Sequence, residues 1–178
     1  VVERLKESNQ KEIEVVNELL EVSSYQIGKE AVRLYIAADI PKLMEETLKD
    51  LKVEAESKGL YLRYRRQGKI PEIPADRLKI KLVLTNVIDN CIKYTAKGGV
   101  SVAMKADKEN LLIAVKDTGI GLSEDVLKNL FKRTFHRGED AQRMFAAGRG
   151  LGLYLSAKII EAHNGRIWAE SDGPGKGS

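Results

Sequence analysis

The feature that most constrains this chain is the run KIKLVLTNVIDNCIKYT, residues 79–95, which is apolar enough for a buried helix yet carries two amides and an ammonium. On a helical wheel, Asn86, Asn90 and Lys93 fall within about 60° of one another. A separate apolar stripe contains Ile80, Leu84, Val87, Ile88 and Cys91. An unpaired buried amide costs about 1–3 kcal/mol. The helix is therefore expected to pack on a sheet with one face and to present a polar wall with the other.

The composition is that of one soluble domain with a small appendage. The chain has 178 residues, of which 43% are apolar and 31% charged, which disfavours a disordered protein. Its one cysteine, Cys91, has no internal disulfide partner, so we expect a small core residue in a reducing compartment. No apolar run reaches the ~20 residues that span a bilayer, and no signal-peptide pattern opens the chain.

Charge is uneven along the sequence. The net charge of +4 is too small to favour nucleic acid as a partner. Basic side chains concentrate between residues 128 and 149, at Lys128, Lys132, Arg133, Arg137, Arg143 and Arg149, together with His136. This cluster has two interpretations, a solvated basic loop or a flap over a phosphorylated ligand.

Apolar periodicity and turn residues predict an alternation of helices and strands. Expected helices are residues 1–26, 40–57, 76–96, 123–131 and 151–163, and expected strands are 32–37, 60–66, 100–106, 111–117 and 166–171. Asp39 and Ser123 are the expected N-caps, and Asp76 lies close to the start of the next helix. The order predicts an α+β fold, a two-layer α/β sandwich with helices on one face of a mixed sheet. The N-terminal amphipathic helix needs a partner for its apolar stripe, either outside the domain or on it.

Two further segments carry possible binding chemistry. In LLIAVKDTGIGLS an apolar strand delivers Asp117 to its exit, where the carboxylate could accept a hydrogen bond from an exocyclic amine such as that of adenine. An ordinary Asx-turn is the alternative. In GRGLGLYLSAKII, glycines at 148, 150 and 152 lead into a helix, where backbone N–H groups can meet phosphate. Neither the Rossmann nor the Walker spacing is present.

The order of the motifs resembles the ATP-binding domain of bacterial sensor histidine kinases, in the GHKL superfamily. Five segments carry the resemblance: NVIDNCIKYT (86–95), DTGIGL (117–122), FKRTFHR (131–137), GRGLGL (148–153) and GPGKGS (173–178). The resemblance implies an ATP-binding catalytic domain over 31–178, without the final strand usual in the family. Residues 1–28 resemble the second helix of the family's dimerisation and phosphoacceptor hairpin.

The resemblance also implies roles for the residues of the polar helix and the strand exit. Asn90 would coordinate Mg²⁺ that bridges the ATP phosphates, with Asn86 beside it. Lys93 would approach the phosphates and Tyr94 would line the ribose and phosphate side. Asp117 would bind the adenine amine, in a turn whose other pocket residues are Gly119, Ile120 and Gly121.

The basic flap and the glycine-rich helix start would complete the site. Arg137 would reach the γ-phosphate, while Phe131 and Phe135 anchor the lid. The backbone cradle would consist of Gly148, Gly150 and Gly152, with Leu151 between them. Arg149, which stands where the family often has Thr or Ser, either contacts phosphate or points to solvent.

The resemblance implies phosphoryl transfer, with Asn86, Lys93 and Arg137 as the catalytic residues. ATP-hydrolysing relatives have a Glu at the place of Asn86 that activates water, so transfer to an external acceptor is favoured over hydrolysis. That acceptor would be a His on the first hairpin helix, absent from this chain; His136 and His163 are not expected to serve. The implied partners are a response regulator receiver domain and a second copy of the parent protein. The implied location is the cytoplasm, whether or not the parent is anchored in the inner membrane. The alternatives are a nucleotide-binding regulatory module without transfer activity and a GHKL-type ATPase.

Overall fold

The computed structural model describes residues 37–132 and 151–178, apart from the side chain of Leu151. The predicted N-terminal helix at 1–26, most of the expected strand at 32–37 and the lid at 133–148 lie outside the described residues. Within the described part, the helices are α2 (Ile40–Ser57), α3 (Arg77–Lys93), α4 (Glu124–Asn129) and α6 (Leu151–Ala162). The strands are β1 (Ala37–Ala38), β2 (Tyr61–Gln67), β3 (Ile73–Pro74), β4 (Gly99–Ala106) and β5 (Leu111–Asp117).

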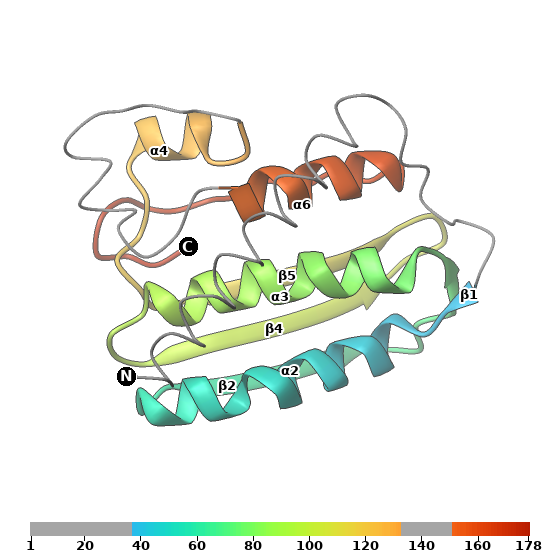
Figure 1. Cartoon of the computed structure of the whole chain (residues 1–178), viewed down its shortest axis with the longest axis horizontal. Helices are drawn as coiled ribbons and strands as arrows, with labels where there is room; N and C mark the ends of the chain where they lie inside the picture. Colours follow the sequence, from blue (N-terminus) through green and yellow to red (C-terminus); the bar gives the residue numbers. More distant parts are fainter. Residues whose placement is uncertain (1–36, 133–150) are drawn as a thin grey trace, which may run out of the picture.

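The main sheet is mixed, in the order β2-β4-β5. β2 pairs with β4 in parallel, and β4 pairs with β5 in antiparallel through the predicted hairpin. Figure 1 shows α2 and α3 in front of this sheet and α6 alongside α3. The expected two-layer α+β fold is confirmed. A second, two-residue pairing of β1 with β3 was not predicted, because so short a bridge leaves no periodicity to read.

Local capping fixes where the helices begin. The Asp39 carboxylate accepts from the Lys42 N–H at 2.9 Å, and the Asp76 carboxylate accepts from the Lys79 N–H at 3.2 Å. The Ser123 hydroxyl accepts from the Val126 N–H at 3.4 Å. The two predicted N-caps, Asp39 and Ser123, are thus confirmed, and Asp76 is a third. Each satisfies one backbone donor that the first helical turn leaves free.

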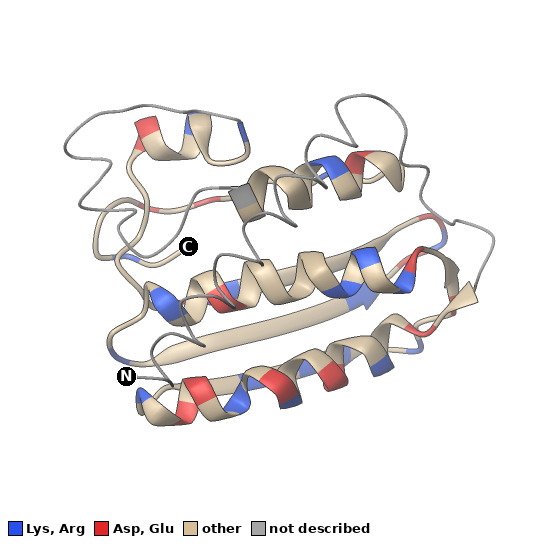
Figure 2. Cartoon of the chain, in the orientation of Figure 1, with Lys and Arg blue, Asp and Glu red and all other residues tan. Residues whose placement is uncertain are grey.

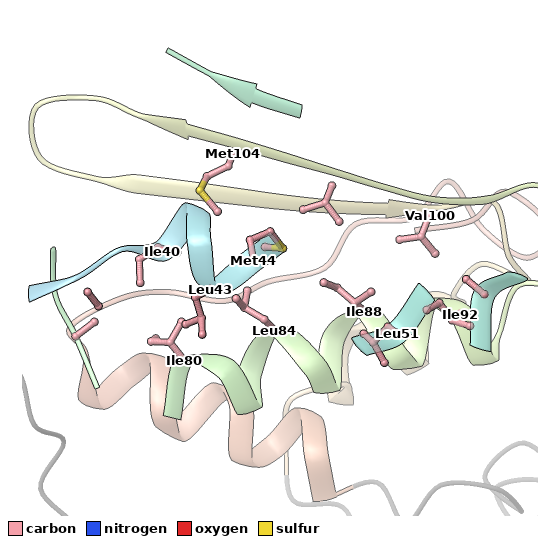
Figure 3. Close-up of a cluster of buried hydrophobic side chains, with 14 of the residues drawn as sticks. Ile40, Leu43, Met44, Leu51, Ile80, Leu84, Ile88, Ile92, Val100 and Met104 are labelled. Atoms are coloured by element: carbon pink, nitrogen blue, oxygen red, sulfur yellow. The ribbon is translucent and has the colours of Figure 1, made fainter. Parts of the chain in front are cut away.

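The core lies between the sheet and the helices. Figure 3 shows Ile80, Ile88 and Ile92 of α3 pointing toward the sheet, where Val100 and Met104 of β4 meet them. Burial of one such side chain stabilises the fold by about 1.5–3 kcal/mol. Val87 was expected on this stripe, but it packs in a second cluster with Tyr154, Leu155 and Ile159 of α6. α3 is therefore covered on two sides, by the sheet and by α6.

The expected strand at 166–171 does not form. Its residues alternate between half-buried and exposed, as the pattern predicted, but none of the described residues pairs with it in a β-ladder. A strand needs a hydrogen-bonded neighbour, whereas the Asp117 N–H at the end of β5 donates to the Ser178 carbonyl, outside the 166–171 segment. Alternation in the sequence indicates which side chains are buried, but it does not show whether a neighbouring strand is there to pair with.

No helix in the described part of the chain has the length and apolar content needed to cross a membrane.

Candidate functional site

The exit of β5 places a carboxylate inside the protein. Asp117 is only 5% exposed. Its Oδ1 accepts from the Gly119 N–H at 2.7 Å, and its Oδ2 accepts from the Ser178 hydroxyl at 2.5 Å. The first bond is the Asx-turn that sequence analysis offered as the alternative to adenine binding. The two are compatible, because each carboxylate oxygen can accept more than one hydrogen bond.

The Cys91 thiol lies next to this carboxylate. Burial first, and then the charge and hydrogen bonding of Asp117, raise the pKa of Cys91 to about 12. The side chain is free and half-buried. Cys91 therefore stays a protonated thiol at neutral pH and serves as a small wall of the Asp117 environment, in agreement with the expected unreactive core residue.

The turn after Asp117 is fixed to the end of α3. The Ile120 N–H donates to the Tyr94 carbonyl at 3.1 Å. A Cβ on Gly119 would lie 2.5 Å from that same carbonyl oxygen and 2.8 Å from Asp117 Oδ1. Glycine is thus required at position 119, because its backbone lies so close to that of Tyr94. The Ile120 side chain has half of its surface in solvent and remains available to a ligand.

Thr118 holds the turn from its other side, a role that the sequence did not reveal. Its hydroxyl donates to the Lys97 carbonyl at 2.8 Å and accepts from the Gly99 N–H at 3.0 Å. A Cβ on Gly98 would lie 2.2 Å from this hydroxyl oxygen. The loop that leaves α3 and the loop that leaves β5 are therefore joined side by side.

The GPGKGS segment closes the back of the same turn. The Gly175 N–H donates to the Ile120 carbonyl at 2.6 Å, and the Ser171 hydroxyl donates to the Gly177 carbonyl at 2.6 Å. Gly121 has φ +66°, and a Cβ there would lie 2.1 Å from the Gly173 oxygen. Ser178, which sequence analysis quoted only as part of a motif, is a direct partner of the site carboxylate.

The polar face predicted for α3 is present, but its two amides, Asn86 and Asn90, make different contacts. Asn86 Nδ2 donates to the Gly152 carbonyl of α6 at 3.3 Å. A Cβ on Gly152 would approach the Asn86 amide to 3.3 Å. Asn86 therefore joins the wall to the start of α6. Asn90 Nδ2 donates to the Asn86 carbonyl at 2.8 Å, which leaves Oδ1 without a hydrogen bond from any of the described residues.

That free amide oxygen fits a magnesium ion. Mg²⁺ binds hard oxygen ligands and commonly takes only one or two from the protein, with phosphate oxygens and waters supplying the rest. The described residues contain no cluster of three or more His, Cys, Asp or Glu that could hold a metal alone. Asn90 Oδ1 is thus suited to an ion that arrives with a phosphorylated ligand.

Lys93 lies one turn further along α3 and is paired within its own helix. Its ammonium is 2.7 Å from the Asp89 carboxylate, and both side chains are partly exposed. Burial lowers the pKa of Lys93, but the hydrogen bond and charge of Asp89 outweigh it, so the pKa lies above its ordinary value. The cation expected to approach phosphate is permanently charged but restrained by a neighbouring anion.

The described members of the predicted site thus form one connected region. Tyr94 ends α3 and accepts from the turn that contains Gly119, Ile120 and Gly121, and Asn86 joins α3 to Gly152. Arg137, Gly148, Arg149 and Gly150 lie outside the described residues, as do Phe135 and His136. Leu151 begins α6, and its side chain is not described.

His163 is occupied elsewhere. Its Nε2 accepts from the Asp76 N–H at 3.0 Å, and its Nδ1 lies 2.7 Å from the Ile159 carbonyl. The ring therefore accepts through Nε2 and donates through Nδ1, and it joins the end of α6 to the start of α3.

Comparison with known proteins bears on this arrangement. Residues 75–178 match the family described as histidine kinase-, DNA gyrase B-, and HSP90-like ATPase. The chain belongs to this family. All the site residues named above lie within the matched range.

Two curated relatives illustrate the similarity. The chain is 33% identical to the sensor histidine kinase GacS of Pseudomonas protegens over 92% of its own length and 18% of that protein. It is 31% identical to the sensor histidine kinase WalK of Bacillus subtilis, over 89% of its length and 26% of that protein. The chain therefore spans about a fifth to a quarter of the length of these two relatives.

Solved structures share the fold. Full-length ShkA in complex with AMPPNP superposes with a TM-score of 0.75 at 24% identity, covering 94% of this chain and 35% of that one. The catalytic domain of the histidine kinase ThkA superposes with a TM-score of 0.65 at 23% identity, covering 75% of this chain and 84% of that one. At these identities the likeness establishes the architecture alone.

Proposed function

We propose that this chain is the ATP-binding catalytic part of a two-component sensor histidine kinase, which transfers the γ-phosphoryl group of ATP to a His on another helix. The observation that carries the proposal is the junction of three elements: the Asn90 wall of α3, the buried Asp117 carboxylate and the start of α6 at Gly152. Family membership and the sensor kinase relatives support it.

In this proposal the adenine lies at the Asp117 end of the site. A buried carboxylate that retains free lone pairs can accept from the exocyclic amine of adenine, and the half-exposed Ile120 can cover the base. Guanine has a carbonyl where adenine has its amine, so it would place acceptor against acceptor. The site is therefore proposed to select adenine nucleotides.

The phosphates extend along α3 toward α6. Asn90 would hold Mg²⁺, which neutralises phosphate charge when bound, and Lys93 supplies a second positive charge. Arg137, Gly148, Arg149, Gly150 and Leu151 are proposed to complete the phosphate side. An imidazole nitrogen would attack the γ-phosphorus as the bond to the β–γ bridging oxygen breaks, and ADP would leave with that oxygen.

Transfer is proposed over hydrolysis because of Asn86. An amide has no basic lone pair with which to activate water, and this one already donates to the Gly152 carbonyl. The alternative of a GHKL-type ATPase is disfavoured on that ground. The alternative of a nucleotide-binding module without transfer would retain the adenine site but have no acceptor.

The wider organisation follows from the same proposal. Residues 1–28 would be the second helix of a dimerisation and phosphoacceptor hairpin, and 31–178 the catalytic domain. The phosphoryl group would pass to a response regulator in the cytoplasm, within a homodimer of the parent. A solved complex of the histidine kinase ThkA with the response regulator TrrA supports such a partner.

Two measurements test the proposal. Calorimetric titration with Mg·ATP should show saturable binding, and absence of binding at about millimolar ligand would contradict it. Incubation with γ-labelled ATP should label a separately supplied first-helix hairpin and leave this chain unlabelled. Steady release of free phosphate without labelling of the hairpin would favour the ATPase.

A further inference from the structure

In the part of the chain that the structure describes, one face of the β2-β4-β5 sheet is not covered by helices, and its charges are separate from the proposed nucleotide site. Side chains alternate across a strand, and the core takes Leu62 and Tyr64 of β2 together with Val100, Val102 and Met104 of β4. The outward positions are therefore Tyr61, Arg63, Arg65 and Gln67 of β2, Ser101, Ala103 and Lys105 of β4, and Leu112, Ala114 and Lys116 of β5.

These outward positions carry four cations and no acidic residue. Arg63, Arg65, Lys105 and Lys116 are all exposed. By contrast, Figure 2 shows Lys and Glu or Asp interspersed along α2, as is usual for a solvated surface. Four like charges on one sheet face repel one another, and that cost falls when an anionic partner binds.

The register places the cations around a floor of small side chains. Arg63 lies beside Ser101, which lies beside Lys116; in the next row Arg65, Ala103 and Ala114 are neighbours. Adjacent strands are about 4.8 Å apart and successive outward positions about 6.7 Å apart. From β2 to β5 the floor spans two strand spacings, about 10 Å, which is close to the diameter of an α-helix. Arg63 and Arg65 lie along one border and Lys116 on the other.

One of the arginines is already held in place. A Cβ on Gly99 would lie 2.7 Å from Tyr61 Cγ, so the Tyr61 ring covers that glycine. The Arg63 guanidinium stacks on the same ring, 4.3 Å from its centroid. A stacked arginine loses less side-chain freedom when it binds a carboxylate, which favours recognition.

We infer that this open face, defined by Arg63, Arg65, Ser101, Ala103, Ala114 and Lys116, is a docking surface for an acidic helical segment of a protein partner. Ala-sized residues on one side of such a helix would pack on the small side chains of the sheet. Carboxylates that flank this side of the helix would pair with Arg63, Arg65 and Lys116, in the geometry that arginine favours. Nucleic acid is a poorer fit, because Tyr61 is covered by Arg63 and no other aromatic residue is outward on these strands to stack with bases.

The inference is tested by fluorescence anisotropy with a labelled helical peptide about 20 residues long, with Ala along one side and Glu on both flanks. Arg63→Glu with Arg65→Glu should weaken binding at least about tenfold. The matched control, Lys42→Glu with Lys49→Glu, makes the same charge change on exposed positions of α2 and should leave affinity within about twofold.

A second variant keeps every charge and tests the shape. Ala114→Phe suits an exposed strand position and should weaken the peptide at least about fivefold by occupying the floor, with an unchanged melting temperature. The inference would be overturned if the α2 control lost as much peptide affinity as the arginine variant, or if Ala114→Phe bound the peptide as well as the unchanged protein. Failure of the unchanged protein to bind the peptide would also overturn it. So would duplex DNA or phosphatidylserine vesicles that bind as tightly as the peptide. ATP binding should be the same in all variants, so the result is independent of the proposed kinase function.

Discussion

Ser178 and Asp117 hold each other through two hydrogen bonds of opposite direction. The Ser178 hydroxyl donates to Asp117 Oδ2 at 2.5 Å, while the Asp117 N–H donates to the Ser178 carbonyl at 2.9 Å. The pair connects the GPGKGS segment to the exit of β5. It fixes the rotamer of the carboxylate that is proposed to bind adenine, so Ser178 is a positioning residue for the site.

Removal of the Ser178 hydroxyl should weaken ATP binding without unfolding the protein. Ser178→Ala deletes one donor to a charged acceptor, a bond of about 1.5–3 kcal/mol, part of which water restores because Ser178 is half-buried. We expect affinity for Mg·ATP to fall about 5–20-fold by calorimetry. Ser57→Ala, which removes an exposed hydroxyl bonded to the Glu54 carbonyl, is the control. Equal affinities of the two variants would count against a positioning role.

Asp117→Asn should weaken adenine nucleotides more than Asn86→Ala does. The first change makes the site neutral and turns one oxygen into an NH₂ that opposes the amine of adenine; a loss of at least about tenfold follows. The second change removes the bond to the Gly152 carbonyl, which loosens α3 against α6 but leaves the adenine end intact. ATP and ADP titrations of both variants measure this order. Equal tolerance of both would contradict the proposed adenine site.

Release of Lys93 from its partner should strengthen ATP binding. Asp89→Asn removes the carboxylate 2.7 Å from the Lys93 ammonium and one negative charge from the side proposed to take phosphates. We expect a several-fold gain in affinity for Mg·ATP that shrinks as salt rises. Asp50→Asn, which removes the exposed α2 carboxylate that pairs with Lys81 of α3, is the matched control. Weaker ATP binding by Asp89→Asn would show that Asp89 has a role of its own with the nucleotide.

Much of the fold follows from the sequence because the signals are local. The N-caps Asp39 and Ser123 were identified from residue type alone, and the four-residue turn at 107–110 predicted the hairpin. Among the site residues, Asn86, Asn90 and Asp117 could be located by motif order. The missing strand at 166–171 and the β1–β3 pair depend on a neighbour distant in sequence, which no local pattern records.

The roles that sequence reasoning missed are likewise contacts between distant segments. Thr118 bonds the loop at Lys97 and Gly99, and Ser178 bonds Asp117. Each is a small hydroxyl residue in a glycine-rich turn, a place where such residues are common for purely local reasons. The i,i+4 spacing of Asp89 and Lys93 was enough to predict their ion pair. The pair was missed because Lys93 was assigned to phosphate binding.

Gly119→Ala should destabilise the protein through a steric conflict. Its new Cβ would lie 2.5 Å from the Tyr94 carbonyl oxygen, and both groups belong to backbone that other bonds hold in place. Overpacking of this kind costs about 1–3 kcal/mol. Gly68→Ala is a useful comparison, because it has open space around it and only the strain of φ +76°. Urea unfolding should rank Gly119→Ala as the more damaging, with loss of ATP binding in that variant alone.

The raised pKa of Cys91 should make the protein less stable in alkali. From its ordinary value of 9.0, the pKa rises in the folded state to about 12. Between these values the unfolded chain loses the thiol proton while the folded protein keeps it, so stability falls as pH rises, with a slope of up to about 1.4 kcal/mol per pH unit. Cys91→Ala removes this contribution. Urea unfolding between pH 8 and about pH 10 should show a flatter decline for the variant, and parallel curves would mean that the Cys91 thiol ionises as readily in the folded protein as in the unfolded chain.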